Sequence, residues 1–319
     1  MFRRSLVSVL AGLLISTTAS AADLTIAVQD IPDVLDPPYD NSNVNERIML
    51  SLFDTLISTD YRDGGKLKPG LATEWKVIDP QTIEFKLRPG VTFHNGDSFD
   101  AKDVAFTFSE LRTGQDPNAS GAVLSKPFLG GIDKVEIIDP LTVRIHMRQP
   151  DALIVQRFAN YPSQIVSKKG FDDAGSPEAF AKNPVGSGPY RLAAFNLGEN
   201  VVLEANDGYW QGRVAAADKV TFTVVPEVST RLAGLLSGQF DIVTEINPDN
   251  FQQIEQAANA AVVGGAVENI RGVVYDSADS VLSDPRIREA LDLAIDRDMI
   301  VKALYNGAPR KIAVTTLPS

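Results

Sequence analysis

The order of the predicted elements indicates an α/β fold that carries an α+β insertion. Three observations support this class. The segment Leu24–Val28 alternates apolar and polar side chains, as a half-buried strand does. Two hairpins of similar sequence follow, at residues 78–87 and 138–147. From Asn183 onward strands and helices alternate in a βαβα order, which is typical of an α/β layer with a partly parallel sheet.

The first residues have the layout of a secretory signal peptide. Arg3 and Arg4 precede an apolar run, and Ala19-Ser20-Ala21 supplies a cleavage site of small residues. The apolar run of about ten residues is too short to cross a hydrocarbon core of roughly 30 Å. We therefore expect cleavage after Ala21 and export of the remaining chain to a periplasm. An uncleaved anchor or a buried helix is the alternative.

The chain is acidic and has no cysteine. Arg3 and Arg4 leave with the signal, so 28 of the 30 basic side chains remain against 41 acidic ones, a net charge of −13. Such a surface repels nucleic acid, which clustered Lys and Arg side chains bind. Without a cysteine after the signal no thioether lipid anchor can form, so we expect the exported protein to be free in solution.

The insertion is predicted to have apolar faces of its own. In each hairpin an Asp-Pro pair supplies the turn, where proline presets φ and the aspartate bonds nearby backbone N–H groups. Asp100 and Asp103 have the spacing of a capping box. They open a helix with its apolar side chains inward, namely Val104, Phe108 and Leu111.

Two further helices are predicted for the α/β layer, one before the insertion and one after it. Asn43 or Asn45 can cap a helix before the insertion. The apolar face of this helix consists of Ile48, Met49, Leu52, Phe53 and Leu56. After the insertion, a helix from Glu227 to Ser237 ends at Gly238, where a helix C′ residue belongs.

The last part of the chain is predicted to hold fewer elements. Asn247 is read as the N-cap of a helix with Pro248 at its first position. A strand over residues 271–275 and a long helix over 285–304 follow. These last fifty or so residues are too few to bury a core by themselves.

Six motifs occur in order along the chain. They are Leu35-Asp36-Pro37 with Leu52-Phe53-Asp54-Thr55-Leu56, Leu71-Ala72 with Trp75, Phe85–Gly96, Asn183–Tyr190, Asn206 with Tyr209-Trp210, and Asp284–Leu291 with Ala294-Ile295-Asp296-Arg297. Together they resemble the extracellular solute-binding protein family 5, the peptide, dipeptide and nickel-complex binders of ABC importers. The resemblance runs through almost the whole chain after the signal.

The resemblance implies a cluster C periplasmic binding protein, with a type II-like fold of two lobes and an extra inserted domain. Residues 1–21 would be the signal peptide. Residues 22–53 and 184–265 would form lobe I, and residues 54–183 would form the inserted α+β domain. Residues 266–319 would begin lobe II, which we expect to be incomplete in this chain.

The residues do not indicate an enzyme, a cofactor or a metal site. Ser187 lacks the spacing of a nucleophile elbow and is interpreted as a serine in a glycine-rich turn. His94 and His146 are 52 positions apart, and neither has a second ligand nearby in sequence. We interpret His94 as structural and His146 as solvated. No glycine-rich loop has the spacing that cradles phosphates.

The candidate ligand-binding residues are Tyr39, Asn41, Ser42 and Asn43, which follow a stiff proline bend. The resemblance implies that the positions of Asn41 and Asn43 give backbone hydrogen bonds to an extended ligand, as in strand addition. The alternative is that this segment only caps a helix, and both can hold. Gly264 and Gly265 are the candidate hinge. The pair Tyr209-Trp210 is read as packing rather than as a stacking platform.

The resemblance implies a monomeric periplasmic protein that captures a peptide or a similar small solute and delivers it to ABC permease subunits. Capture would proceed by lobe closure. Because the groups for the ligand ends are expected largely in the rest of lobe II, we expect weak or absent binding by this chain alone. The alternative is a truncated, transport-incompetent remnant with an interaction role only.

Overall fold

The computed structural model describes residues 23–39, 43–115, 125–213, 217–264 and 273–305. The chain divides into two compact units, one that extends to Val224 and one that begins at Val225. None of the helices in these ranges combines the length and the apolar character that crossing a bilayer requires. The predicted signal peptide lies outside the described residues.

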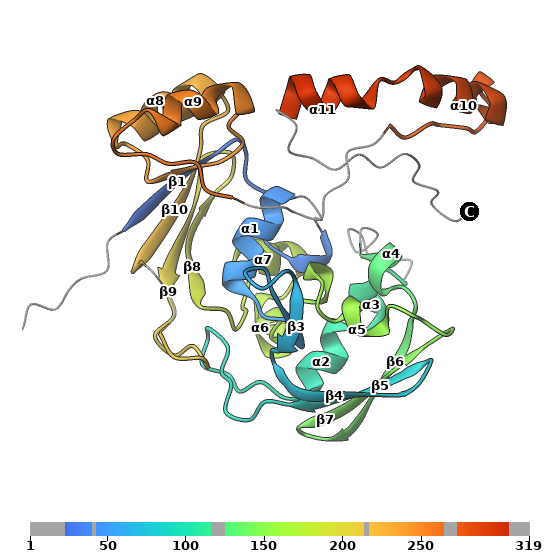
Figure 1. Cartoon of the computed structure of the whole chain (residues 1–319). Coiled ribbons are helices and arrows are strands. Elements are labelled where there is room, and N and C mark those ends of the chain that lie inside the picture. Colours follow the sequence, from blue (N-terminus) through green and yellow to red (C-terminus); the bar gives the residue numbers. More distant parts are fainter. Residues whose placement is uncertain (1–22, 40–42, 116–124, 214–216, 265–272, 306–319) are drawn as a thin grey trace, which may run out of the picture. The chain divides into compact units, whose positions relative to one another are not determined.

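A mixed sheet forms the first layer of the first unit (Figure 1). Its strands within this unit are β1 (Leu24–Val28), β10 (Lys219–Val224), β9 (Asn200–Ala205) and β8 (Tyr190–Asn196), in that spatial order. β1 and β10 run parallel, whereas the other neighbours are antiparallel. The partly parallel sheet predicted from the sequence is therefore confirmed.

Helices from two distant parts of the chain cover this sheet: α1 (Asn43–Leu52), α6 (Lys168–Ala174) and α7 (Pro177–Lys182). The apolar face predicted for α1 and the residues after it is buried throughout, from Ile48 to Leu56. One core combines side chains of residues 28–53 with side chains of residues 166–222. The core that packs on the first sheet is thus complete only after the chain returns to it beyond residue 165.

A second sheet lies in the part of the chain between these segments, in the order β4-β5-β7-β6. Its strands are β4 (Ala72–Asp79), β5 (Thr82–Leu87), β6 (Ile132–Asp139) and β7 (Thr142–Met147). Both hairpins were predicted, and so was the turn chemistry. The Oδ1 atoms of Asp79 and Asp139 each accept a backbone N–H two residues on, at 2.8 Å.

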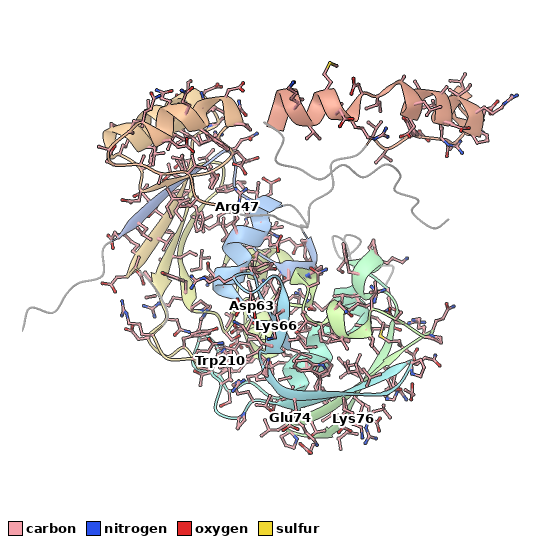
Figure 2. The ribbon with its side chains drawn as sticks, in the orientation of Figure 1. Arg47, Asp63, Lys66, Glu74, Lys76 and Trp210 are labelled. Carbon is pink, nitrogen blue, oxygen red and sulfur yellow. The ribbon has the colours of Figure 1, made fainter. Side chains whose placement is uncertain are left out.

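The two faces of the second sheet differ in polarity. The inner face is buried and carries Ile83, Phe85, Leu87, Val143, Ile145 and Met147. Glu74 and Lys76 are exposed on β4 and project away from the core (Figure 2). The strands β2 (Ile57–Asp60) and β3 (Lys66–Pro69) form a separate two-stranded antiparallel ribbon. The buried side chains of this core all lie within residues 56–165.

Short helices cover the inner face: α2 (Ala101–Thr107), α3 (Glu110–Thr113), α4 (Lys126–Leu129) and α5 (Ile154–Arg157). The capping box of Asp100 and Asp103 is confirmed. Val104 and Phe108 are buried as predicted. Leu111 is 39% exposed, so its predicted inward position is wrong. The helix ends at Thr107 and a new one begins at Glu110, which rotates Leu111 away from the α2 face.

In the second unit, α8 (Val228–Ser237) is followed by Gly238 with φ of 78°, which confirms the predicted helix end. The strand β11 is limited to Ile242–Val243. Asn247 is the N-cap residue and Pro248 holds the first position after it, as predicted, but the Asn247 side chain makes no capping hydrogen bond. A 3-10 turn, η4 (Pro248–Asn250), comes first, and α9 (Phe251–Glu255) follows it.

The long helix predicted over residues 285–304 is interrupted. The structure has η5 (Val281–Ser283), α10 (Pro285–Ala294) and α11 (Arg297–Tyr305). Ile295 is extended, and the Asp296 carboxylate accepts the Met299 N–H at 2.9 Å, as an N-cap side chain does. The predicted strand at 271–275 is also wrong where it is described, because residues 273–275 have no strand structure.

Candidate functional site

The predicted ligand-binding segment lies at the start of α1. Tyr39 ends a 3-10 turn, η1 (Pro37–Tyr39), and Asn43 is the first residue of α1. Asn41 and Ser42 lie between them, outside the described residues. The binding role of all four residues stays a prediction.

The Tyr39 side chain is uncharged, so it can form hydrogen bonds to a neutral ligand group. It is partly buried. Burial, with the nearby Asp36 carboxylate, raises the pKa of the Tyr39 phenol. The hydroxyl therefore stays protonated at neutral pH and can both donate and accept a hydrogen bond.

The predicted hinge at Gly264 and Gly265 is only half described. Gly265 lies outside the described residues. A Cβ added to Gly264 would meet no heavy atom within 4 Å. The backbone therefore has free space at this position, and the hinge role stays a prediction.

A buried ion pair anchors the bend before Tyr39. The Asp36 carboxylate accepts two hydrogen bonds from the Arg112 guanidinium, at 2.5 and 2.6 Å. Asp36 is 0% exposed and Arg112 3%. No local sequence pattern indicates a role for Arg112, because its partner is 76 positions away.

A partly buried carboxylate, that of Asp54, accepts hydrogen bonds from three side chains. Ser187 Oγ donates to Asp54 Oδ2 at 2.9 Å, and Trp210 Nε1 donates to the same oxygen at 3.0 Å. Tyr209 OH donates to Oδ1 at 2.9 Å. The only sequence signal was a carboxylate in the apolar run Leu52–Leu56.

The Asp54 network explains the Tyr209-Trp210 pair. Trp210 packs against the core of residues 56–165 (labelled in Figure 2), and the Arg88 guanidinium carbon lies 4.2 Å from the centre of its ring. The Arg88 side chain also donates from Nε to the Gly70 carbonyl at 3.0 Å. This arrangement supports the packing interpretation of the aromatic pair.

His94 bonds to Gly188, the residue after Ser187, and so lies beside the Asp54 network; together they form a junction between distant segments of the chain. The His94 ring is held in one tautomer. Its Nε2 is 3.1 Å from the Gly188 carbonyl oxygen, so Nε2 carries the proton. Its Nδ1 is buried and has no hydrogen-bond partner. Burial lowers the pKa of His94 to about 4. His94 is therefore neutral at physiological pH and fastens a loop, as the structural interpretation predicts.

The contacts of the junction do not assemble a nucleophile and its base. Ser187 is fully buried, and its hydroxyl donates directly to a carboxylate. Within the described ranges, no three His, Cys, Asp or Glu side chains are grouped as metal ligands would be. The junction holds together strands, turns and loops that are far apart in sequence.

Asp54 and His94 should give opposite pH dependences of stability. Burial raises the pKa of Asp54 to about 6. The folded state then binds the extra proton between about pH 4 and 6, so Asp54 lowers the free energy of unfolding as pH rises. For His94 the unfolded state binds the extra proton between about pH 4 and 6.5. The contribution of His94 to the free energy of unfolding therefore rises with pH. In the wild type the two slopes offset each other.

In the variant Asp54→Asn, we expect the pH dependence of the free energy of unfolding to show the contribution of His94 without the opposing contribution of Asp54. The variant should lose about 3 kcal/mol relative to the wild type between pH 6.5 and pH 4, which corresponds to roughly two pKa units. Urea unfolding at pH 4.0, 5.0, 6.5 and 7.5 measures the difference. The matched variant His94→Gln should show the opposite slope. Parallel curves for wild type and Asp54→Asn would contradict the expectation.

Comparison with protein families matches residues 66–319 to the bacterial extracellular solute-binding proteins, family 5, middle region. Among curated proteins, the dipeptide-binding protein of Escherichia coli (strain K12) is 27% identical over 317 residues, which cover 94% of this chain and 59% of that protein. The glutathione-binding protein GsiB of Pectobacterium atrosepticum is 29% identical, with 96% and 58% covered. The chain thus spans about three fifths of the length of these relatives.

Solved structures show the same fold. The periplasmic binding protein DppA of Helicobacter pylori, in complex with the peptide STSA, matches with a TM-score of 0.78 and 26% identity over 91% of this chain and 60% of that one. NikZ of Campylobacter jejuni, in complex with Ni(L-His), matches with a TM-score of 0.76 at 24% identity over 89% of this chain and 55% of that one. The type II periplasmic-binding-protein fold expected from the motifs is confirmed.

Proposed function

This chain belongs to the bacterial extracellular solute-binding proteins of family 5, and on that premise we propose that it captures peptides for an ABC importer. The supporting observation is the fold likeness to a peptide-complexed binding protein over 91% of the chain. In this proposal the exported protein binds its solute in the periplasm without transforming it. It then delivers the solute to permease subunits in the inner membrane.

The proposed lobes follow the division of the buried core. One core joins residues 28–53 to residues 166–222, which supports placing residues 22–53 in one lobe with the start of residues 184–265, and this core also contains Val166 and Phe180. The buried side chains of the other core all lie within residues 56–165, which supports an inserted domain within residues 54–183. A second lobe would begin near residue 266, with the hinge at Gly264 and Gly265.

The proposed binding mode is strand addition along Tyr39–Asn43. In this mode backbone N–H and carbonyl groups supply the affinity, so ligands with different side chains bind the same segment. Support comes from the position of this segment, between a proline turn with an anchored aspartate and the first residue of α1. The neutral Tyr39 hydroxyl adds a polar group that can bond to a peptide carbonyl or N–H.

Peptide titration followed by NMR at the amides of Tyr39 and Asn43 tests this function. We expect Met-Leu and Ser-Thr-Ser-Ala, added at about 1 mM and above, to shift the same amides. An oligoproline of equal length should not shift them, because proline has no backbone N–H to donate. If neither peptide shifts these amides, or if oligoproline shifts them equally, the proposed binding mode is wrong.

A further inference from the structure

The stretch Asp36-Pro37-Pro38 has few means of attachment. Proline has no backbone N–H, so neither Pro37 nor Pro38 can donate a hydrogen bond to the rest of the protein. The side chain of Asp36 is therefore the strongest polar anchor in this stretch. Both of its carboxylate oxygens are used by one guanidinium, in the bidentate geometry that fixes orientation as well as distance.

The backbone of Asp36 also forms a hydrogen bond, to the residue that ends the proline turn. The Asp36 carbonyl accepts the Tyr39 N–H at 3.0 Å and so closes the turn η1. The preceding N–H, that of Leu35, donates to the Ala181 carbonyl at 2.9 Å. The path of the chain into Tyr39 is thus determined by contacts of Leu35 and Asp36.

Arg112 is itself held in place. Its guanidinium carbon lies 5.7, 5.3 and 6.0 Å from the ring centres of Phe106, Phe171 and Phe180. These rings come from α2, α6 and α7, so helices of two different cores surround the cation. The backbone carbonyl of Arg112 accepts a hydrogen bond from Ser125 Oγ at 3.2 Å.

A buried ion pair of this kind is weak evidence for stability. Removing two charges from water costs about as much as their attraction returns, and an apolar pair of similar volume is often equally stable. What an apolar pair does not supply is the fixed direction of two parallel hydrogen bonds. The pair between Asp36 and Arg112 therefore determines geometry more than it determines stability.

We propose that Arg112 is a positioning residue for ligand binding, which acts through Asp36 to fix the backbone at Tyr39. This inference rests on the proposed function. Arg112 is buried and touches no ligand in this proposal. It holds the bend so that the backbone at Tyr39 is presented in one conformation, which lowers the entropy that a bound peptide would otherwise have to remove.

The decisive variant is the double substitution Asp36→Leu with Arg112→Met, which replaces the pair by apolar side chains. We expect its thermal midpoint to stay within about 4 °C of the wild type. Amide exchange at Tyr39 should become at least about tenfold faster. Arg157→Met is the matched control, since it breaks the Arg157–Asp151 pair within the inserted region and should leave exchange at Tyr39 unchanged. Unchanged exchange at Tyr39 in the double variant overturns the proposal.

Arg112→Lys keeps the charge but offers no bidentate fork. We expect exchange at Tyr39 between that of the wild type and the double variant, and this variant decides the question if the double variant does not fold. Exchange equal to the wild type then overturns the proposal. Met-Leu titration supplies the functional readout, with an affinity at least about tenfold weaker in the double variant.

The two readouts separate the inference from the function on which it rests. If Met-Leu does not shift the wild-type amides, the proposed function fails, while exchange at Tyr39 still decides whether Arg112 positions this segment. If Met-Leu binds the wild type and the double variant equally, the positioning role is wrong and the proposed function stands.

Discussion

Gly188→Ala is expected to lower the free energy of unfolding by about 3 kcal/mol or more. A Cβ at this position would lie 2.4 Å from the Ser51 carbonyl oxygen and 2.5 Å from the Leu52 carbonyl carbon. These are backbone atoms at the end of α1 and cannot rotate away as a side chain can. The loop must therefore shift.

A shift of this loop would disturb three hydrogen bonds. The Gly188 N–H donates to the Leu52 carbonyl at 2.9 Å. The Gly188 carbonyl accepts from His94 Nε2 at 3.1 Å and from Asn206 Nδ2 at 2.9 Å. Each buried group left without a partner costs about 1–3 kcal/mol. The steric effect and the loss of these bonds therefore act in the same direction.

Urea denaturation measures this effect, and Gly208→Ala is its control. A Cβ at Gly208 would lie 3.4 Å from the Asn206 Oδ1 atom, an ordinary contact. We expect Gly208→Ala to change the free energy of unfolding by less than about 1 kcal/mol. Equal stability of the two variants would show that the close approach at Gly188 is not needed.

Asp54→Ala is expected to cost about 3 kcal/mol or more in stability. It would remove the acceptor of three donors, those of the buried Ser187 and Tyr209 and of the partly buried Trp210. The serine and tyrosine hydroxyls can turn to other acceptors, but the indole N–H of Trp210 is a donor only. The cavity left by the carboxylate adds to the loss.

Asp54→Asn should be much milder, within about 1 kcal/mol of the wild type at pH 7.5. The amide oxygen can accept from Ser187 and Trp210, while its NH₂ group can donate to the Tyr209 hydroxyl, which also accepts. The substitution also removes a carboxylate whose pKa burial has raised to about 6, and whose ionised form is therefore unfavourable in the folded state.

Tryptophan fluorescence during urea unfolding distinguishes the two Asp54 variants, and Ser187→Ala is the intermediate case. The latter removes one donor and leaves Tyr209 and Trp210 bonded to Asp54. Its expected loss is about 1 kcal/mol. If Asp54→Ala were as stable as Asp54→Asn, the network would not be the element that holds this junction together.

Local patterns predicted most elements of the first unit correctly. The two Asp-Pro turns, the capping box at Asp100 and the buried face of α1 each depend on residues within about ten positions of one another. The predictions were wrong where two local signals favoured different structures. The apolar periodicity of residues 285–304 extends across Asp296, but this side chain caps a new helix instead of continuing the old one.

The sequence by itself determined the class of fold, the order of most strands and helices and the family, because periodicity, turn chemistry and short motifs act within a few residues. Only the tertiary structure decided how the Asp54 network assembles. Its donors lie 133, 155 and 156 positions from the carboxylate. The pairing of Asp36 with Arg112 was decided in the same way. Such partners are selected by the path of the folded chain, since a buried charge needs whichever donor the packing brings within about 3 Å.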